Sequence, residues 1–191
     1  MITIEKAQYT NLYDNIKNAK SAVDVPKTEK RVYLTGITYL DGNFYITDGK
    51  CCIRILCGNS FNIPNGVYEI GITKSHIYLT PNTEGHPDFQ SIFEYGDTAG
   101  KYTLTVAGKK PEYGQLATHI AVFAATKRLI DAVKLHKLIS KTKVWGQVAV
   151  LSSSDGAVFV VTPDIKICLM PISCDIEAER KYIAENGKAS F

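Results

Sequence analysis

Apolar residues recur at helical spacing near the start of the chain and then give way to a run of strand-type residues. The helical spacing within residues 7–23 predicts an amphipathic helix with one packed face, made of Tyr9, Leu12, Tyr13, Ile16, Ala19 and Val23. A short strand is predicted before this helix, at Ile2–Ile4, and further strands are predicted after it over residues 31–56. Asp41-Gly42 interrupts these strands, and its glycine supplies the positive φ that a tight hairpin requires. The first part of the chain therefore predicts a β-α-β-β-β unit.

The same order of elements recurs after residue 117. A strand is predicted at 119–122, a helix at 124–139 and strands over 143–170, with a turn at Asp155-Gly156. The two Asp-Gly turns lie 155 − 41 = 114 positions apart, and Lys50–Ile53 matches Ile165–Cys168 in kind. This repeat predicts an α+β fold with an internal pseudo-two-fold, in which the helices lie on one side of antiparallel sheets.

The repeat also predicts how the chain is divided. Residues 1–174 are expected to form one domain, with halves at 1–57 and 118–174 and an inserted segment at 58–117 between them. Glycine and proline punctuate this segment, and the stretches between them are typical of strands, at 67–70, 76–79 and 102–106. Residues 175–191 are expected to form a helical tail outside the repeat.

Composition excludes several classes of protein. The chain is 45% hydrophobic and 21% charged, and it carries a net charge of only +3, so overall charge does not identify a nucleic-acid binder. It has no apolar run of about 18 residues, which predicts no membrane span, and no secretory signal is visible. Its five cysteines follow no disulfide or zinc pattern, which favours reduced thiols, a cytoplasmic location and no bound metal. Because no catalytic or phosphate-loop motif is present, neither an enzyme nor a cofactor is expected.

The second predicted helix has an unusual distribution of charge. Its lysines gather opposite the apolar face, and Asp131 is the only acid in the segment; they are Lys127, Lys134, Lys137 and Lys141. A solvated surface explains such a face, and so does contact with phosphates, for which lysine supplies a flexible point charge. Lys17 on the first helix is a weaker candidate for the same contact.

Three short strings resemble the bacterial beta clamp family of DNA sliding clamps, whose domains are built from doubled β-α-β-β-β units. Ile46–Lys50 is similar to the family's "ATDGHR" string, Cys168–Ile172 to its closing "VMPM" string, and His86–Phe89 to its "FPDY" segment. The resemblance implies a DNA-clamp-like domain with helices on the inner wall of a ring. The family places three such domains in one chain, whereas this chain has residues for one domain and an insertion.

The resemblance also implies two sites and several partners. Duplex DNA would contact the lysine face without sequence preference. DNA polymerase or another replication protein would dock a peptide between the first two strings, at Thr47, Gly49, Lys50, Cys52, Cys168, Met170 and Pro171. Edge strands would join copies of the chain into a homo-oligomer. The assembly would serve as a processivity or docking factor of a phage type.

Simpler interpretations of the same residues stay open. The Thr47–Gly49 string is equally typical of an ordinary turn, and Met170 of a core residue. A clamp-fold interaction or regulatory protein that makes no ring would also satisfy the repeat, for example a viral protein that binds a replication or defence component through the segment at 58–117. A β-rich assembly protein with a coincidental repeat is the third alternative.

Overall fold

The computed structural model describes residues 1–58, 61–94, 101–106, 132–143, 146–152 and 157–170. In the first part of the chain, strand β1 (Ile2–Glu5) is followed by helix α1 (Thr10–Ala22) and a four-residue helix, α2 (Val32–Thr35). Five strands come next: β2 (Ile37–Leu40), β3 (Asn43–Thr47), β4 (Cys51–Leu56), β5 (Gly66–Ile72) and β6 (His76–Asn82). Asp41 and Gly42 both have positive φ, at 46° and 80°, which confirms the predicted hairpin between β2 and β3.

The described residues of the second part of the chain form two helices and four strands. They are α3 (Phe89–Glu94), β7 (Lys101–Val106), α5 (Ala132–Lys141), β8 (Gly146–Ser152), β9 (Val158–Val161) and β10 (Ile165–Leu169). Parts of the predicted repeat lie outside the described residues: the strand at 119–122, the start of the second helix, the Asp155-Gly156 turn and the tail at 175–191.

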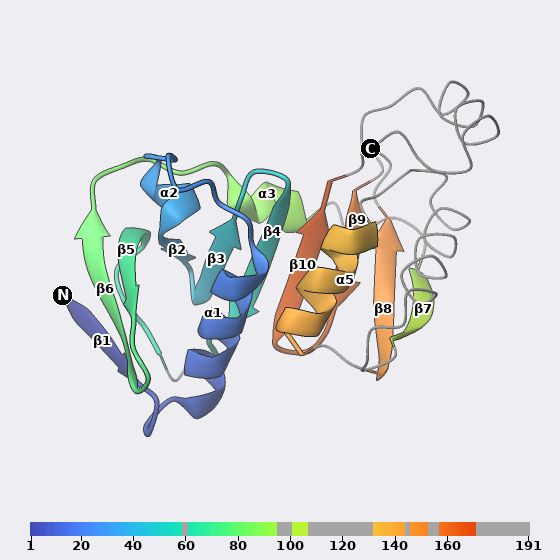
Figure 1. Ribbon diagram of the computed structural model, residues 1–191, viewed down its shortest axis with the longest axis horizontal. Coiled ribbons are helices and arrows are strands. Elements are labelled where there is room, and N and C mark those ends of the chain that lie inside the picture. The colour runs from blue at the N-terminus through green and yellow to red at the C-terminus, as the bar shows by residue number, and fades with distance from the viewer. Residues whose placement is uncertain (59–60, 95–100, 107–131, 144–145, 153–156, 171–191) are drawn as a thin grey trace.

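The ten strands among the described residues form one antiparallel sheet, in the order β1-β6-β5-β2-β3-β4-β10-β9-β8-β7 (Figure 1). The order is symmetric about the β4–β10 pair, with β3 and β9, then β2 and β8, at equal distances from it. Strands β4 and β10 begin 165 − 51 = 114 positions apart, the same offset as the two Asp-Gly turns. The predicted α+β fold with an internal pseudo-two-fold is therefore confirmed.

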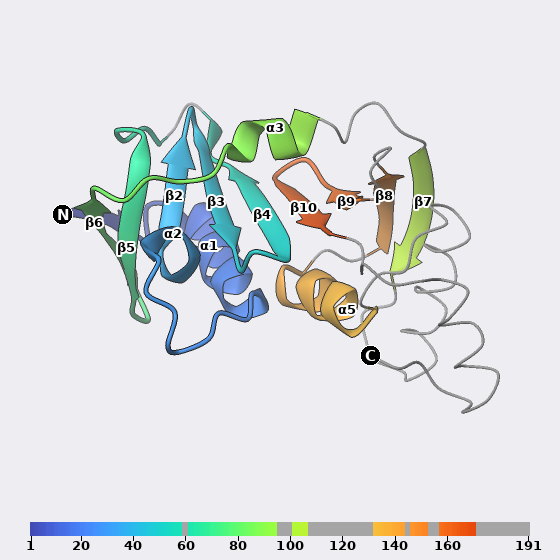
Figure 2. The same cartoon turned by 90° about the horizontal axis from the view of Figure 1, so that it is seen from above.

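The sheet has a helical layer on one face. Helices α1 and α5 lie side by side there, one over each half (Figure 2). The apolar stripe predicted for the first helix packs as expected, with Tyr13, Ile16 and Ala19 fully buried. Leu135, Leu138 and Ile139 of α5 join the same core, which also contains Ile53 and Ile167 from the central strands. Burial of these side chains fixes both helices on the sheet.

The opposite face of the sheet carries a smaller apolar cluster under α3, a helix that the sequence pattern does not predict. Phe89 and Phe93 of α3 pack there on Tyr45 and Phe159. Asp88 caps the helix, because its Oδ1 accepts the backbone N–H of Ser91 at 3.2 Å. Among the described residues, no helix combines the length and the apolar character needed to cross a membrane.

The strand predicted at residues 31–34 is wrong, because Val32–Thr35 forms helix α2. Gly36 decides this local structure: its N–H donates to the carbonyl of Val32 at 2.6 Å, and its backbone approaches Tyr68 on β5 closely. The β-branched and aromatic residues there have strand propensity, but tertiary packing overrides it.

The strands of the segment at 58–117 belong to the sheet. β5 pairs with β2, β6 pairs with β1, and β7 pairs with β8. The strands predicted at 67–70, 76–79 and 102–106 are therefore confirmed, and the division of the chain into two halves with an inserted segment stays a prediction.

We expect Gly36→Ala to destabilise the fold, because a Cβ at this position would lie 2.1 Å from the carbonyl oxygen of Tyr68 and 2.8 Å from that of Val32. Overpacking of this kind costs about 1–3 kcal/mol, measurable as a lower midpoint in urea. Gly85→Ala is the matched control, since a Cβ there meets nothing within 4 Å. Equal stabilities for the two variants would contradict the close approach.

Candidate functional site

A groove of about 350 Å³ lies where the two halves of the sheet meet beneath α3. Its walls are the β3–β4 turn, the end of β10, α2 and the start of α3. The apolar part of the lining comes mainly from Tyr33, Leu34, Pro87, Phe89, Ile92 and Met170. Met170 is 50% exposed, so the groove presents an accessible apolar side chain at its rim.

The residues predicted for a peptide site come together in this groove. Thr47, Gly49, Lys50 and Cys52 line it from the first half, and Cys168 and Met170 line it from the second. Pairing of β4 with β10 causes this, since it sets Cys52 opposite Cys168, and the Met170 N–H donates to the Lys50 carbonyl at 3.0 Å. Pro171 lies outside the described residues. Pro87 and Phe89 of the third string line the same groove.

The β3–β4 turn is held in shape by its own side chains. The hydroxyl of Thr47 donates to the carbonyl of Cys51 at 2.6 Å and accepts the N–H of Gly49 at 3.0 Å. Gly49 has φ 84°, in the left-handed region that glycine tolerates best. The Thr-Asp-Gly string is thus an ordinary turn, as its sequence suggests, and it also forms one wall of the groove.

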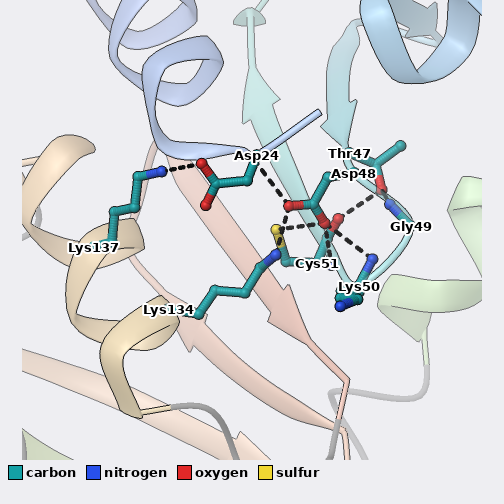
Figure 3. A network of polar contacts seen from close by, with 8 residues as sticks. All are labelled: Asp24, Thr47, Asp48, Gly49, Lys50, Cys51, Lys134 and Lys137. Atoms are coloured by element: carbon teal, nitrogen blue, oxygen red, sulfur yellow. Dashed lines mark hydrogen bonds and ion pairs between the residues drawn. The ribbon is translucent and has the colours of Figure 1, made fainter. Parts of the chain in front are cut away.

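Asp48 in this turn is the centre of a polar network (Figure 3). Its Oδ1 accepts the N–H groups of Lys50 and Cys51, at 3.0 and 3.1 Å. Its Oδ2 accepts the N–H of Asp24 at 3.1 Å and the Nζ–H of Lys134 at 2.5 Å. One carboxylate therefore joins the groove turn, the segment after α1 and helix α5.

The ion pair between Asp48 and Lys134 is shielded from water, with side chains 1% and 10% exposed. Burial acts to raise the pKa of Asp48, but the hydrogen bonds from Lys134 and from the Asp24 and Lys50 backbones outweigh it and hold the pKa below its ordinary value. Burial likewise acts to lower the pKa of Lys134, but its bond to Asp48 prevails and the pKa is raised. Both groups therefore stay charged near neutral pH.

The predicted lysine face is only partly present. Lys134 is not an exposed cation, because it points inward to Asp48. Lys137 pairs with the exposed carboxylate of Asp24. Lys141 and Lys17 are exposed, and Lys127 lies outside the described residues. Helical spacing placed Lys134 opposite the apolar face, but it could not show that a carboxylate of the first half reaches that position.

The cysteines of the groove are buried thiols with little nucleophilic character. Burial raises the pKa of Cys168 to about 12 and that of Cys52 well above its ordinary value. Within the described ranges, no group of His, Cys, Asp or Glu is arranged to hold a metal ion. The thiols of Cys52 and Cys168 therefore act as buried lining of the groove.

Sequence reasoning missed two contributors to the site. Asp48 looked like an ordinary turn residue, because nothing in the sequence links it to a lysine 86 positions away. Arg31, Tyr33 and Leu34 line the groove from α2 and the residue before it, but a strand was predicted there. No local signal identifies either contribution.

Comparison with solved structures identifies the architecture. The beta subunit of DNA polymerase III from Thermotoga maritima matches 95% of this chain with a TM-score of 0.54 at 12% sequence identity. The same subunit from Borrelia burgdorferi matches 92% with a TM-score of 0.60 at 10% identity. This chain has the fold of a DNA sliding clamp. The sliding clamp of Bartonella birtlesii, solved bound to griselimycin, matches 91% with a TM-score of 0.56 at 11% identity.

The likeness to clamps is one of fold. The match spans 67%, 65% and 66% of those three clamp chains, so this clamp-fold chain corresponds to about two-thirds of the length of each. The sequence matches no protein-family model and no curated protein. The resemblance first seen in three short strings is thus confirmed for the fold.

The ion pair predicts a dependence of stability on pH. The folded-state pKa of Asp48 is lowered, so its carboxylate contributes stability above its unfolded pKa of about 3.9, which is lost as pH falls through the folded-state value. Asp48→Asn leaves Lys134 without its carboxylate and should cost about 3 kcal/mol at neutral pH. The difference in unfolding free energy between wild type and Asp48→Asn, measured with urea, should become smaller in acid. A difference that is constant with pH would contradict the assignment.

Proposed function

We propose that this clamp-fold protein is a cytoplasmic, non-enzymatic accessory of DNA replication that docks a short segment of a partner protein, such as a DNA polymerase, in the groove. One observation carries the proposal. Three strings far apart in the sequence, at 47–52, 86–89 and 168–170, converge on a single groove that presents an exposed methionine. Methionine suits such a surface, because its flexible thioether adapts to different apolar ligands.

The charges around the groove define the segment that would fit. Lys50 is exposed at the rim, Arg31 is exposed but bound to Glu29, and Asp48 is buried against Lys134. The charge that the groove offers to a ligand is therefore positive, beside an apolar floor. The best occupant is a segment with apolar side chains next to carboxylates, which pair with the exposed lysine and select against basic segments.

Contact with duplex DNA and self-association form the second part of the proposal. Helices α1 and α5 lie on the same face of the sheet (Figure 2). Lys17 of α1 and Lys141 of α5 are exposed cations, and lysines bind phosphates without reading sequence. Strands β1 and β7 end the described sheet, and pairing of such edges between copies would build a homo-oligomer. A clamp fold that docks partners without encircling DNA remains the alternative, and pairing of Lys134 and Lys137 with carboxylates favours it.

We expect Met170→Glu to weaken peptide binding in the groove by about tenfold or more, because it replaces an exposed apolar contact with a charge. The probe is a set of labelled ten-residue peptides with apolar centres and flanks of Asp/Glu, Asn/Gln or Lys/Arg, followed by fluorescence anisotropy. Leu56→Glu is the control, since Leu56 is 38% exposed but does not line the groove. Equal loss in both variants, or in neither, would remove the groove from the function.

The DNA contact predicts that neutralising Lys17 and Lys141 together, as Lys17→Gln/Lys141→Gln, weakens binding to a short duplex. The slope of log K against log salt should fall by about 2, one unit for each lost phosphate contact. Lys74→Glu makes the same change in net charge in the β5–β6 turn and should leave binding unchanged. If the double variant and the control behave alike, the helical face does not contact DNA.

A further inference from the structure

The groove turn is anchored to a residue that does not line the groove. Lys134 lies on α5, outside the groove lining, yet its Nζ holds Oδ2 of Asp48. The other oxygen of that carboxylate accepts the N–H groups of Lys50 and Cys51, which form the wall of the groove. Since the two oxygens belong to one rigid, planar carboxylate, a bond at Oδ2 restricts the positions that Oδ1 can take. Figure 3 shows these contacts radiating from Asp48 toward the turn and toward α5.

A second contact ties the same carboxylate to the end of the other helix. The N–H of Asp24 donates to Oδ2 of Asp48, and the side chain of Asp24 pairs with Lys137, one turn along α5 from Lys134. Two lysines of α5 thus form ion pairs with two acids of the first half. The inner pair, Asp48–Lys134, is buried, and the outer pair, Asp24–Lys137, is more exposed. The inner pair is therefore screened less by water and salt and contributes more to the docking of α5.

The charge on Asp48 explains why the inner pair matters for the turn. A carboxylate that is 1% exposed depends on its partners to stay an anion, and Lys134 is the cationic one among them. Without Lys134, the side chain would take up a proton or rotate toward water, and the N–H groups of Lys50 and Cys51 would lose an ionised acceptor. The groove wall would then relax, although no residue that lines the groove had changed.

We propose that Asp48 and Lys134 are positioning residues of the groove, so that it takes its binding shape only when α5 is docked on the first half. The expected effect on ligand binding rests on the proposed docking function. The effect of Lys134 on the shape of the turn does not. Docking of α5 and occupation of the groove then stabilise each other, since coupling between two binding events is reciprocal. The ligand class is the one proposed for the groove, an apolar segment with adjacent carboxylates.

The test uses the full chain and three substitutions on α5. Lys134→Met removes the cation at similar length, Lys134→Arg restores it, and Lys137→Met removes the exposed outer pair as a matched control. Each variant is titrated with the same peptide set, and amide hydrogen exchange is followed by NMR. We expect Lys134→Met to weaken peptide binding about tenfold and to speed exchange at Lys50 and Cys51, while exchange at Tyr68 and Leu79 in the first half stays unchanged. Lys134→Arg should recover both properties, and Lys137→Met should leave both near the wild-type values.

Several outcomes separate this inference from the function on which it rests. If wild-type protein binds no peptide, the docking function fails, and the exchange rates of Lys50 and Cys51 still decide the positioning role. If Lys134→Met binds peptide like the wild type, or if exchange rises equally across the sheet, the positioning role is overturned. Should Lys134→Met fail to fold, Lys134→Gln serves in its place and is judged by the same exchange pattern.

Discussion

The antiparallel pairing of β4 with β10 is the contact on which the rest of the molecule depends. It converts two half-sheets into one continuous sheet and sets Cys51–Ile55 against Ile165–Leu169 in a fixed register. A shift of that register by one residue would turn every side chain of a central strand to the wrong face. Alternation along β4 sends Ile53 to the core under the helices and Cys52 to the cluster under α3. The same pairing brings residues of both halves to one groove.

Electrostatics reinforces this junction from the helical side. Lysine side chains that face outward on a helix are usually solvated, and exposed ion pairs contribute little to stability. Lys134 behaves differently, because the turn of the first half brings a buried carboxylate to it and both charges leave water together. Such a pair adds geometric definition more than net stability, and removal of either partner is costly. Lys134, which the sequence predicts to contact DNA, therefore forms a buried ion pair inside the protein.

The groove, and not the likeness of fold to sliding clamps, carries the functional argument. Sequence identities of 10–12% to the three clamps described above leave the fold as the shared property, and function must be argued from the site itself. The site has an accessible methionine, a floor of buried thiols and aromatic rings, and a rim lysine. The thiols of Cys52 and Cys168 are buried and their pKa values are raised, so they act as lining of the groove. Because two lysines of α5 pair with acids, docking of a protein partner is better supported than contact with DNA.

The repeat, the amphipathic face of α1, the hairpin at Asp41-Gly42 and most of the described strands can be predicted from the sequence alone. These features are local, since side-chain periodicity and the φ preference of glycine act over a few residues. Three other features depend on tertiary contacts: the helix at Val32–Thr35, the cover that α3 gives to the second face, and the inward direction of Lys134. Each of those depends on a partner distant in sequence: Tyr68 beside Gly36, Tyr45 beneath Phe89 and Asp48 beside Lys134. Local pattern cannot specify such a partner, because its position is set by the register of strands and the packing of helices.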